Sequence, residues 1–491
     1  MSQPPASLPS LKRSLAYVFG GRFMRALIQI ASAAIIARLL TPEEMGIFAV
    51  ASASIAISTA LAEFGIHPYL VQVDALSKAI VGRAFGLMGL INWSLAFLLF
   101  FGRGVIAQFY GNPEIENVIA VLSLNFLFNP FVTIGLALLM RELRYGKLTI
   151  INIMAGGAGS AISVLLALQD FGPISLAFGS IVMKLMLIIG IFRLKPMYLS
   201  FRPRFRGLKE IVGFGSWAVG ASLVQSAGNQ SPELIIGRGL GLEAAGLFDR
   251  GMTVTRLVNQ QIAGSLSTVL TPFFAQERRD KLDLKARFLI RLQTTAGVIW
   301  PLMLIMAGSS YSLILFLFGP QWTQAAPVAG ILAISATLHM PFGIGRQLLL
   351  SHGKVKQIFL IETSMQLAKV ALIVLAARHG LPYIAAALIG PAIIFIILAN
   401  YQVSQVLSLR ASDWWTALKP SLLVTFGVGL TIGGVVYGLG YAPKGLPIAN
   451  LAIYGSIGLA GWLISLWLVR HPMRLEITRL LKKIIKKNKS Q

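Results

Sequence analysis

Arginine and amide side chains recur at helical spacing inside a stretch that is otherwise apolar. Arg256, Asn259 and Gln260 follow an i, i+3, i+4 pattern, so they share one face of a helix. In a bilayer, a central charge costs between about 3 and 17 kcal/mol unless it faces water or a partner. Arg256 lies near the middle of its apolar stretch, too deep to reach the surface easily. This spacing therefore predicts a polar, cationic face that lines a cavity within a membrane.

A second polar face occurs near the N-terminus. Arg22, Arg25 and Gln29 are spaced by three and four residues and lie on one side of a helix. One interpretation is a cationic stripe that faces the same cavity. The other is that both arginines extend their long side chains to the cytoplasmic surface, which their positions early in the stretch also allow.

Acidic residues and one further lysine also interrupt the apolar runs. Glu233 is a candidate proton or cation site, or a partner for Arg250. Asp249 precedes Arg250 directly, which favours a pair at the membrane interface. Glu362 and Lys369 share a face but lie two turns apart, too far for a direct bond. We expect Lys369 to contribute to the cavity, and Glu233, Asp249 and Glu362 to be the candidates for coupling to an ion.

The composition requires lipid as the solvent for most of these residues. The chain of 491 residues is 56% hydrophobic and only 12% charged, with a mean hydropathy of +0.74. Soluble domains carry about 25% charged residues. The net charge of +25 would suggest nucleic acid in a soluble protein, but here the basic residues lie between apolar runs. We therefore expect an all-α polytopic membrane protein without a nucleic-acid partner.

Apolar runs of the length that crosses a bilayer core occur about fourteen times. They lie near residues 15–37, 46–66, 82–102, 117–139, 149–168, 173–192, 211–236, 245–268, 292–318, 325–348, 357–377, 382–403, 415–438 and 448–469. Loops on one side of this arrangement hold most of the 43 Lys and Arg residues. Because cytoplasmic loops carry the excess of basic residues, this alternation places both termini in the cytoplasm.

The sequence contains an internal repeat. The segments Ile35–Phe48 (IIARLLTPEEMGIF) and Ile235–Phe248 (IIGRGLGLEAAGLF) match at seven positions without a gap, at an offset of 200 residues. Each copy is expected to form a hairpin between two helices on the outer side. The repeat predicts two pseudo-equivalent bundles of six helices each, followed by two C-terminal helices.

The repeat sets the expected domain boundaries. These are a cytoplasmic N-terminal tail (1–14), an N-terminal lobe (15–200), a C-terminal lobe (201–410), two further helices (411–470) and a C-terminal tail (471–491). The tail is basic and amphipathic, so we expect it to bind anionic membrane lipids. Two lobes in one chain make a monomer sufficient.

Motifs for catalysis are absent from the sequence. It has no GxxxxGK[ST] phosphate loop and no HExxH motif. We therefore expect no catalytic residues, no metal site and no cofactor, and hence no enzyme. A proton gradient, a sodium gradient, the membrane potential or consumption of the product would then supply the energy. Because basic residues outnumber acidic ones within the spans, the cavity favours an anion, and Arg suits a phosphate or a carboxylate.

Two long motifs resemble those of a known family. They are IIARLLTPEEMGIFAVASASIA, followed by EFGIHPYLVQ, in the first half, and PELIIGRGLGLEAAGLFDRG, followed by LTPFFAQ, in the second. They resemble Wzx-type polysaccharide flippases of the MOP exporter superfamily, in the polysaccharide transporter branch that is similar to colanic-acid exporters. The sequence departs from this pattern at Glu233, where relatives often carry Asp, and at Phe248-Asp249-Arg250, where they carry an aromatic-rich segment.

The resemblance implies a function and a location. It implies fourteen helices around a cationic cavity in the bacterial inner membrane, and the flipping of undecaprenyl-pyrophosphate-linked oligosaccharides for surface polysaccharide export. Arg25 and Arg256 would contact the pyrophosphate or acidic sugars, and a polysaccharide polymerase or export machinery would be a partner. Two alternatives stay open. They are a multidrug or cation antiporter of the same superfamily, which calls for an acidic cavity, and a membrane glycan polymerase or ligase, which calls for a large outer loop.

Overall fold

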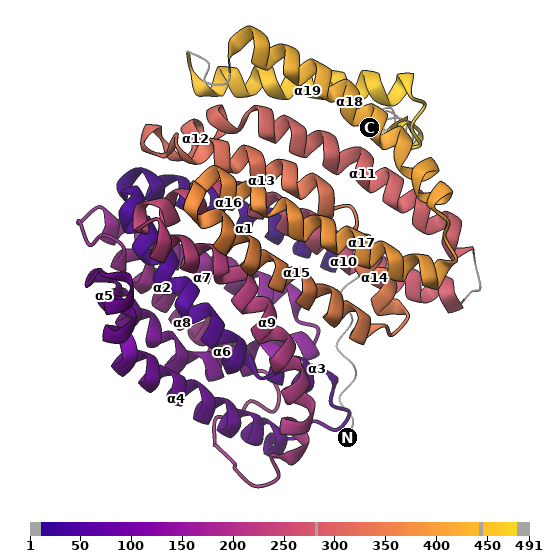
Figure 1. Cartoon of the computed structure of the whole chain (residues 1–491). Coiled ribbons are helices and arrows are strands. Elements are labelled where there is room, and N and C mark those ends of the chain that lie inside the picture. The colour runs from indigo at the N-terminus through magenta and orange to yellow at the C-terminus, as the bar shows by residue number, and fades with distance from the viewer. Residues whose placement is uncertain (1–10, 280–282, 441–444, 479–491) are drawn as a thin grey trace, which may run out of the picture. The chain divides into compact units, whose positions relative to one another are not determined.

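The computed structural model describes residues 11–279, 283–440 and 445–478. Within these ranges the regular secondary structure is entirely helical (Figure 1). The chain divides into two compact units, Met1–Gly246 and Leu247–Gln491. The expected N-terminal tail lies almost wholly outside the described residues, as does the basic end of the C-terminal tail. The predicted lobe boundaries stay a prediction.

The first unit contains nine helices in its described residues, and a tenth begins at its end. Their bounds are α1 (Leu11–Leu39), α2 (Pro42–Glu63), α3 (Ile66–Gln72), α4 (Lys78–Tyr110), α5 (Glu114–Ser123), α6 (Asn125–Arg141), α7 (Tyr145–Ala167), α8 (Ile174–Leu194), α9 (Lys209–Gly239) and α10 (Leu242–Arg279). The helix α1 packs on α7, α7 packs on α8, and α9 packs on α2.

The second unit continues the helical pattern. Its bounds are α11 (Leu284–Gly308), α12 (Ser310–Phe318), η1 (Pro320–Trp322), α13 (Ala325–His339), α14 (Gly343–Ser351), α15 (Val355–Ala376), η2 (Ala377–His379), α16 (Leu381–Ala387), α17 (Ile389–Leu407), α18 (Ala411–Leu439) and α19 (Pro447–Leu468). The two last helices pack on each other, and α18 lies along α11 (Figure 1).

Length and composition make eleven spans of the described chain long and apolar enough to cross a membrane. Four of them consist of two α-helices in succession, with bounds Pro42–Gln72, Glu114–Arg141, Ala325–Ser351 and Leu381–Leu407. The long helices α1, α9 and α10 bring the total to the fourteen expected. Their mean hydropathy is lower than that of most of the other spanning helices, because they carry the polar residues identified above. The predicted fold class, a polytopic all-helical membrane protein, is confirmed.

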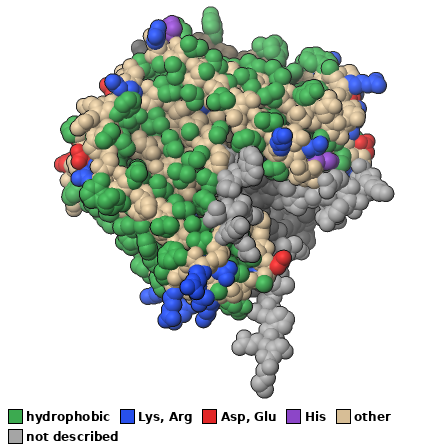
Figure 2. All heavy atoms as spheres, turned by 60° about the horizontal axis from the view of Figure 1, so that its bottom comes forward, with side chains coloured by type: hydrophobic (Ala, Val, Ile, Leu, Met, Phe, Trp, Pro, Cys, Tyr) green, Lys and Arg blue, Asp and Glu red, His purple; other side chains and the backbone are tan. Residues whose placement is uncertain are grey.

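The surface agrees with a lipid environment. Hydrophobic side chains spread over most of the face in Figure 2, and Lys and Arg gather in separate groups. Large apolar side chains on the membrane-spanning helices are widely exposed, among them Tyr437 (95%) and Leu468 (78%). In water such exposure over so many residues would promote aggregation. These side chains therefore face lipid.

The repeat forms two equivalent hairpins, as predicted. In the first copy α1 ends at Leu39 and α2 begins at Pro42; in the second, α9 ends at Gly239 and α10 begins at Leu242. Both pairs of bounds differ by 200 residues. Thr41 caps α2, because its hydroxyl accepts the Glu44 N–H (3.3 Å) and the Glu44 carboxylate accepts the Thr41 N–H (2.7 Å).

The two copies of the repeat also touch each other, through Gly46 and Gly246. A Cβ atom at Gly46 would lie 1.7 Å from the Leu242 carbonyl oxygen, and one at Gly246 would lie 2.0 Å from the Pro42 carbonyl oxygen. Each contact is the other's equivalent at the offset of 200. Glycine is thus required at both positions, since any side chain would overlap the facing backbone.

The C-terminal helices are fastened to α11 by a small buried polar group. Ser421 on α18 donates to the Gln293 carbonyl oxygen (2.9 Å), and its Oγ lies 3.1 Å from His471 Nε2. The Met473 N–H donates to His471 Nδ1 (3.2 Å). Because Nδ1 accepts and Nε2 faces a hydroxyl whose proton is used, His471 is a neutral imidazole protonated at Nε2. It is fully buried beside Gly297.

Candidate functional site

The predicted polar face of α10 contains a cluster of one carboxylate and two guanidinium groups. Asp249 Oδ2 lies 2.9 Å from Arg250 Nη2, and Asp249 Oδ1 lies 3.6 Å from Arg256 Nη1. Asp249 and Arg256 are two helical turns apart and share a face. The structure therefore contains an ion pair between Asp249 and Arg250, and Asp249 is shared with Arg256.

The two arginines of this cluster have different surroundings. Arg250 has a side chain only 10% exposed, and its guanidinium lies 5.7 Å from the ring centre of Phe318 and 5.9 Å from that of Trp322. These cation–π contacts tie α10 to α12 and η1. The side chain of Arg256 is 44% exposed and reaches Met252 Sδ at 3.1 Å. Arg250 is thus a packing residue, whereas Arg256 presents its charge at the surface of its unit.

The polar face of α10 continues with Asn259 and Gln260. Asn259 is half-buried. The side chain of Gln260 lies outside the described residues, so its contribution to the cavity stays a prediction.

On α1, Arg25 and Gln29 are both exposed. Arg25 Nε donates to the Gly21 carbonyl oxygen at 3.4 Å, along its own helix. One turn earlier, a Cβ atom at Gly21 would lie 2.0 Å from Thr149 Cγ2, so α1 is pressed against α7 there. The side chain of Arg22 lies outside the described residues. The structure thus leaves the Arg25 side chain exposed on the surface of the first unit.

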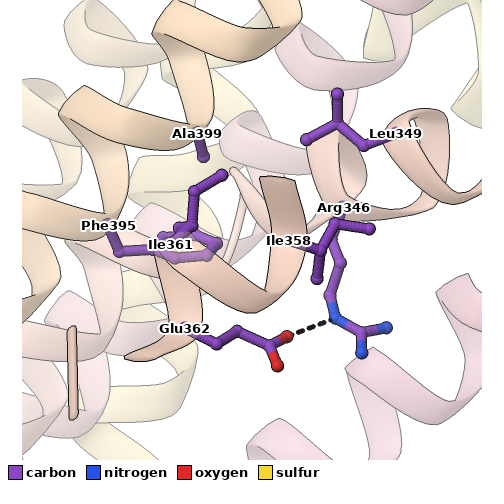
Figure 3. Close-up of a pocket in the computed structure, with 7 residues that line it drawn as sticks. All are labelled: Arg346, Leu349, Ile358, Ile361, Glu362, Phe395 and Ala399. Atoms are coloured by element: carbon purple, nitrogen blue, oxygen red, sulfur yellow. Dashed lines mark hydrogen bonds and ion pairs between the residues drawn. The ribbon is translucent and has the colours of Figure 1, made fainter. Parts of the chain in front are cut away.

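Glu362 pairs with a residue that the sequence did not suggest. Its Oε1 accepts a hydrogen bond from Arg346 Nε at 2.7 Å, and this ion pair joins α15 to α14 (Figure 3). Arg346 lies within α14. Lys369 is half-buried on α15.

Glu233 is buried in α9, with 3% of its surface exposed. The surrounding packing is close: Tyr110 donates to the Leu234 carbonyl oxygen (3.4 Å), and a Cβ atom at Gly237 would lie 2.5 Å from Val50 Cγ2. A carboxylate at this depth is costly when ionised. Its role in ion coupling stays a prediction, as do those of Asp249 and Glu362.

A polar cluster around Lys184 was missed at the sequence level. Lys184 Nζ donates to Asn129 Oδ1 (2.8 Å) and to the Asn125 carbonyl oxygen (3.1 Å), and Asn125 Nδ2 donates to Ser180 Oγ (2.8 Å). The signal was present in the sequence. Asn125 and Asn129 are four residues apart on α6, as are Ser180 and Lys184 on α8, so each pair forms one polar face.

Within the described residues, no group of three or more His, Cys, Asp or Glu side chains is placed to hold a metal ion. Several ionisable side chains in the spanning helices instead form pairs of opposite charge, as at Asp249 and Glu362, and the Lys184 ammonium is held by amide and carbonyl oxygens. Such arrangements can bind and release an anion at the exposed arginines.

Comparison with known families identifies the chain. Residues 35–327, more than half of its length, match the model of the family described as polysaccharide biosynthesis protein. The chain belongs to this family. The predicted membership of the polysaccharide transporters is thereby confirmed.

Curated members resemble this polysaccharide biosynthesis protein at moderate identity. It is 28% identical over 310 residues to the succinoglycan biosynthesis transport protein ExoT of Rhizobium meliloti (strain 1021), with 62% of each chain covered. The match therefore spans less than two thirds of ExoT. Identity is 22% to the teichuronic acid biosynthesis protein TuaB of Bacillus subtilis (strain 168), over 83% of this chain and 85% of TuaB. The chain is 23% identical to the lipopolysaccharide biosynthesis protein WzxC of Escherichia coli (strain K12), and the match covers 91% of each chain.

Solved structures share the fold of this polysaccharide biosynthesis protein. The lipid II flippase MurJ, in an inward closed conformation, superposes with a TM-score of 0.75 at 14% identity, over 92% of this chain and 98% of MurJ. An inward-facing multidrug resistance MATE family transporter of the MOP superfamily gives 0.56 at 13% identity, over 81% of this chain and all of that one. At such identities the likeness concerns the fold alone, and it agrees with the predicted architecture.

Proposed function

We propose that this protein flips undecaprenyl-pyrophosphate-linked oligosaccharide units across the bacterial cytoplasmic membrane for export of a surface polysaccharide. It works by alternating access of its two lobes, without covalent chemistry, and both termini lie in the cytoplasm. The single observation that carries the proposal is the family match over residues 35–327. Relatives named for succinoglycan transport and for teichuronic acid and lipopolysaccharide biosynthesis support it, as does a fold shared with a lipid II flippase.

The charges of the spanning helices support an anionic cargo. Arg25 and Arg256 are exposed, and the guanidinium group matches a pyrophosphate with two parallel hydrogen bonds. Asp249 contacts both Arg250 and Arg256, and Arg256 is the more exposed of the two arginines. Its guanidinium is therefore the group of this cluster that we assign to the phosphates or acidic sugars of the cargo.

A gradient or the downstream reaction supplies the energy in this proposal. Glu233, Asp249 and Glu362 are the carboxylates within membrane helices that could carry a proton or hold a sodium ion. Consumption of the flipped sugar unit by a polymerase would equally make transport run in one direction. The C-terminal tail would bind anionic lipids, and one chain suffices for the transport cycle.

A second candidate is a multidrug or cation antiporter, which the MATE-like fold favours. The two functions differ in the charge that the protein must hold. A cation antiporter needs a carboxylate that is accessible and not already neutralised, whereas Asp249 contacts two arginines and Glu362 contacts one. The observed pairing therefore favours an anionic cargo.

Deletion of the gene tests the proposal. Lipids extracted from the deletion strain are labelled from one leaflet at a time, and lipid-linked sugars are measured in each. We expect complete sugar units to accumulate on the inner leaflet and to clear when the gene is restored. An unchanged lipid pool, together with loss of a gradient-driven drug efflux, would establish the antiporter instead.

A further inference from the structure

A pocket in the second unit combines one ion pair with an apolar wall. Arg346 and Glu362 lie at its mouth, and Leu349, Ile358, Ile361, Phe395 and Ala399 line the rest (Figure 3). Three helices, α14, α15 and α17, supply these residues. The pocket is a shallow, half-open depression. Its shape and chemistry suit a molecule with a charged head and an apolar body.

The guanidinium of Arg346 is only partly used within the protein. Its Nε donates to Glu362 Oε1, while both terminal nitrogens point away from the carboxylate (Figure 3). Among the residues that the structure describes, these two nitrogens have no hydrogen-bond partner. The side chain of Arg346 is 41% exposed. A pair of parallel N–H donors is therefore presented at the mouth of the pocket, in the geometry that binds a phosphate.

The pocket lies close to one end of its helices. Arg346 is five residues from the end of α14, and Glu362 is seven residues from the start of α15, which is about 7–10 Å at 1.5 Å per residue. Lys354 and Lys356 are exposed at the same ends. A charge at this depth lies near the headgroup region of a bilayer, where lipid phosphates are found.

We propose that this pocket binds the phosphate group of a lipid, and that Glu362 is a built-in competitor for it. The terminal nitrogens of Arg346 hold the phosphate, and Ile358, Ile361 and Phe395 cover the first apolar carbons. Glu362 holds Arg346 while the pocket is empty and lowers its affinity for the incoming anion. Two lipids carry this chemistry, the polyprenyl cargo and an ordinary anionic phospholipid; the first source rests on the proposed function.

The alternative is an ion pair that only fastens α14 to α15. Side chains exposed to the extent of Arg346 (41%) and Glu362 (24%) gain little stability from pairing. A purely structural pair also predicts that losing either partner has the same effect. The lipid site predicts opposite effects, because one residue binds the phosphate and the other competes with it.

Binding measurements on the purified full chain in phosphatidylcholine nanodiscs distinguish the two. Undecaprenyl phosphate and phosphatidylglycerol are titrated separately, and bound lipid is counted by native mass spectrometry. We expect Arg346→Gln to weaken binding by about 10- to 100-fold, the usual effect of losing a charged hydrogen-bond partner. Glu362→Gln should tighten binding several-fold. Lys356→Gln, which removes an exposed charge at the same helix end but outside the pocket, is the matched control and should change binding less than about threefold.

The outcomes separate the site from the proposed function. Arg346→Lys keeps the charge but loses the paired donors, so it should weaken binding less than Arg346→Gln; melting followed by tryptophan fluorescence checks that each variant is folded. Stronger binding of undecaprenyl phosphate assigns the pocket to the cargo, and equal binding assigns it to membrane phospholipid. Unchanged affinity in Arg346→Gln, or equal weakening by Arg346→Gln and Glu362→Gln, would overturn the site. Either result leaves the deletion-strain test of transport unaffected.

Discussion

Gly46 and Gly246 pack so closely that one added methyl group at either position should push two helices apart. The Cβ atom of Gly46→Ala would lie 1.7 Å from the Leu242 carbonyl oxygen, whereas non-bonded heavy atoms rest about 3.5–4.0 Å apart. The α2 and α10 backbones must therefore separate locally by about 2 Å. The obstacle is backbone, so no side chain can rotate away to relieve the overlap.

The cost should be at the upper end for overpacking. Inserted methylene groups typically cost 1–3 kcal/mol, occasionally more, and buried neighbours such as Met45 and Ala245 also lose contacts here. We expect about 3 kcal/mol, seen as a drop of about 5 °C or more in the melting temperature. Gly246→Ala should behave alike. The double variant should cost less than the sum, because the first methyl group has already separated the helices.

Melting of the detergent-solubilised protein, followed through its tryptophan fluorescence, measures this effect. Gly102→Ala is the matched control, since a Cβ atom there meets nothing within 4 Å. It should leave the melting temperature unchanged or raise it slightly, because alanine favours the helix by about 1 kcal/mol. If Gly46→Ala melts like the control, or if the two alanines are strictly additive, the reasoning about this contact is wrong.

Three further substitutions test other parts of the molecule. Arg256→Ala should insert normally but lower lipid-linked sugar transport about 10- to 100-fold. Its control, Arg378→Ala on the exposed η2 turn, should transport normally. Full transport by Arg256→Ala would remove Arg256 from the site. Lys184→Met should lower the free energy of unfolding by about 1–3 kcal/mol, because it leaves the Asn129 amide oxygen without its donor. Adding Asn129→Leu should restore most of that loss. If the double variant shows no recovery in a melting experiment, the hydrogen bond between Lys184 and Asn129 does not stabilise the fold. Burial lowers the pKa of His471 from 6.5 to about 4, so the unfolded chain binds more protons between these values and stability falls as the pH drops, by about 3 kcal/mol in total. Melting temperatures from pH 7.5 to 4 should show this slope in the native protein and not in His471→Gln.

The helices could be predicted from the sequence because hydropathy and repeat spacing depend on residues that are close in the chain. All fourteen apolar stretches became helical, and the hairpin bounds of the repeat agree at the offset of 200. Some interruptions within spans carried a signal that was not used, such as Pro341 between α13 and α14. The break at Leu124 between α5 and α6 carried a weaker signal, the polar Ser123 and Asn125 on either side of it.

The candidate site was predictable only in part. A single helix shows which polar residues share its face, so the contact between Asp249 and Arg256 follows from their spacing. Partners on other helices depend on tertiary packing, which one sequence does not contain. For this reason Arg346 and Asn129 were not recognised as the partners of Glu362 and Lys184. The cavity roles of Arg25, Gln29, Asn259 and Lys369 stay predictions.

The low hydropathy of α1, α9 and α10 has a consequence for how the chain enters the bilayer during synthesis. Each arginine near the centre of a nascent helix adds about 2.5–3.5 kcal/mol to its insertion free energy, and in α9 the interior polar residues include Gln225, Asn229 and Glu233. These helices therefore partition poorly on their own. The strongly apolar α2 follows α1 after a two-residue turn and can draw it into the membrane. By contrast, α9 is followed by the equally polar α10, but α2, on which α9 packs, is already in place when α9 emerges. The order of synthesis thus provides α9 with its partner, and a permuted chain that begins at α9 should leave that helix outside the bilayer in a glycosylation-mapping experiment.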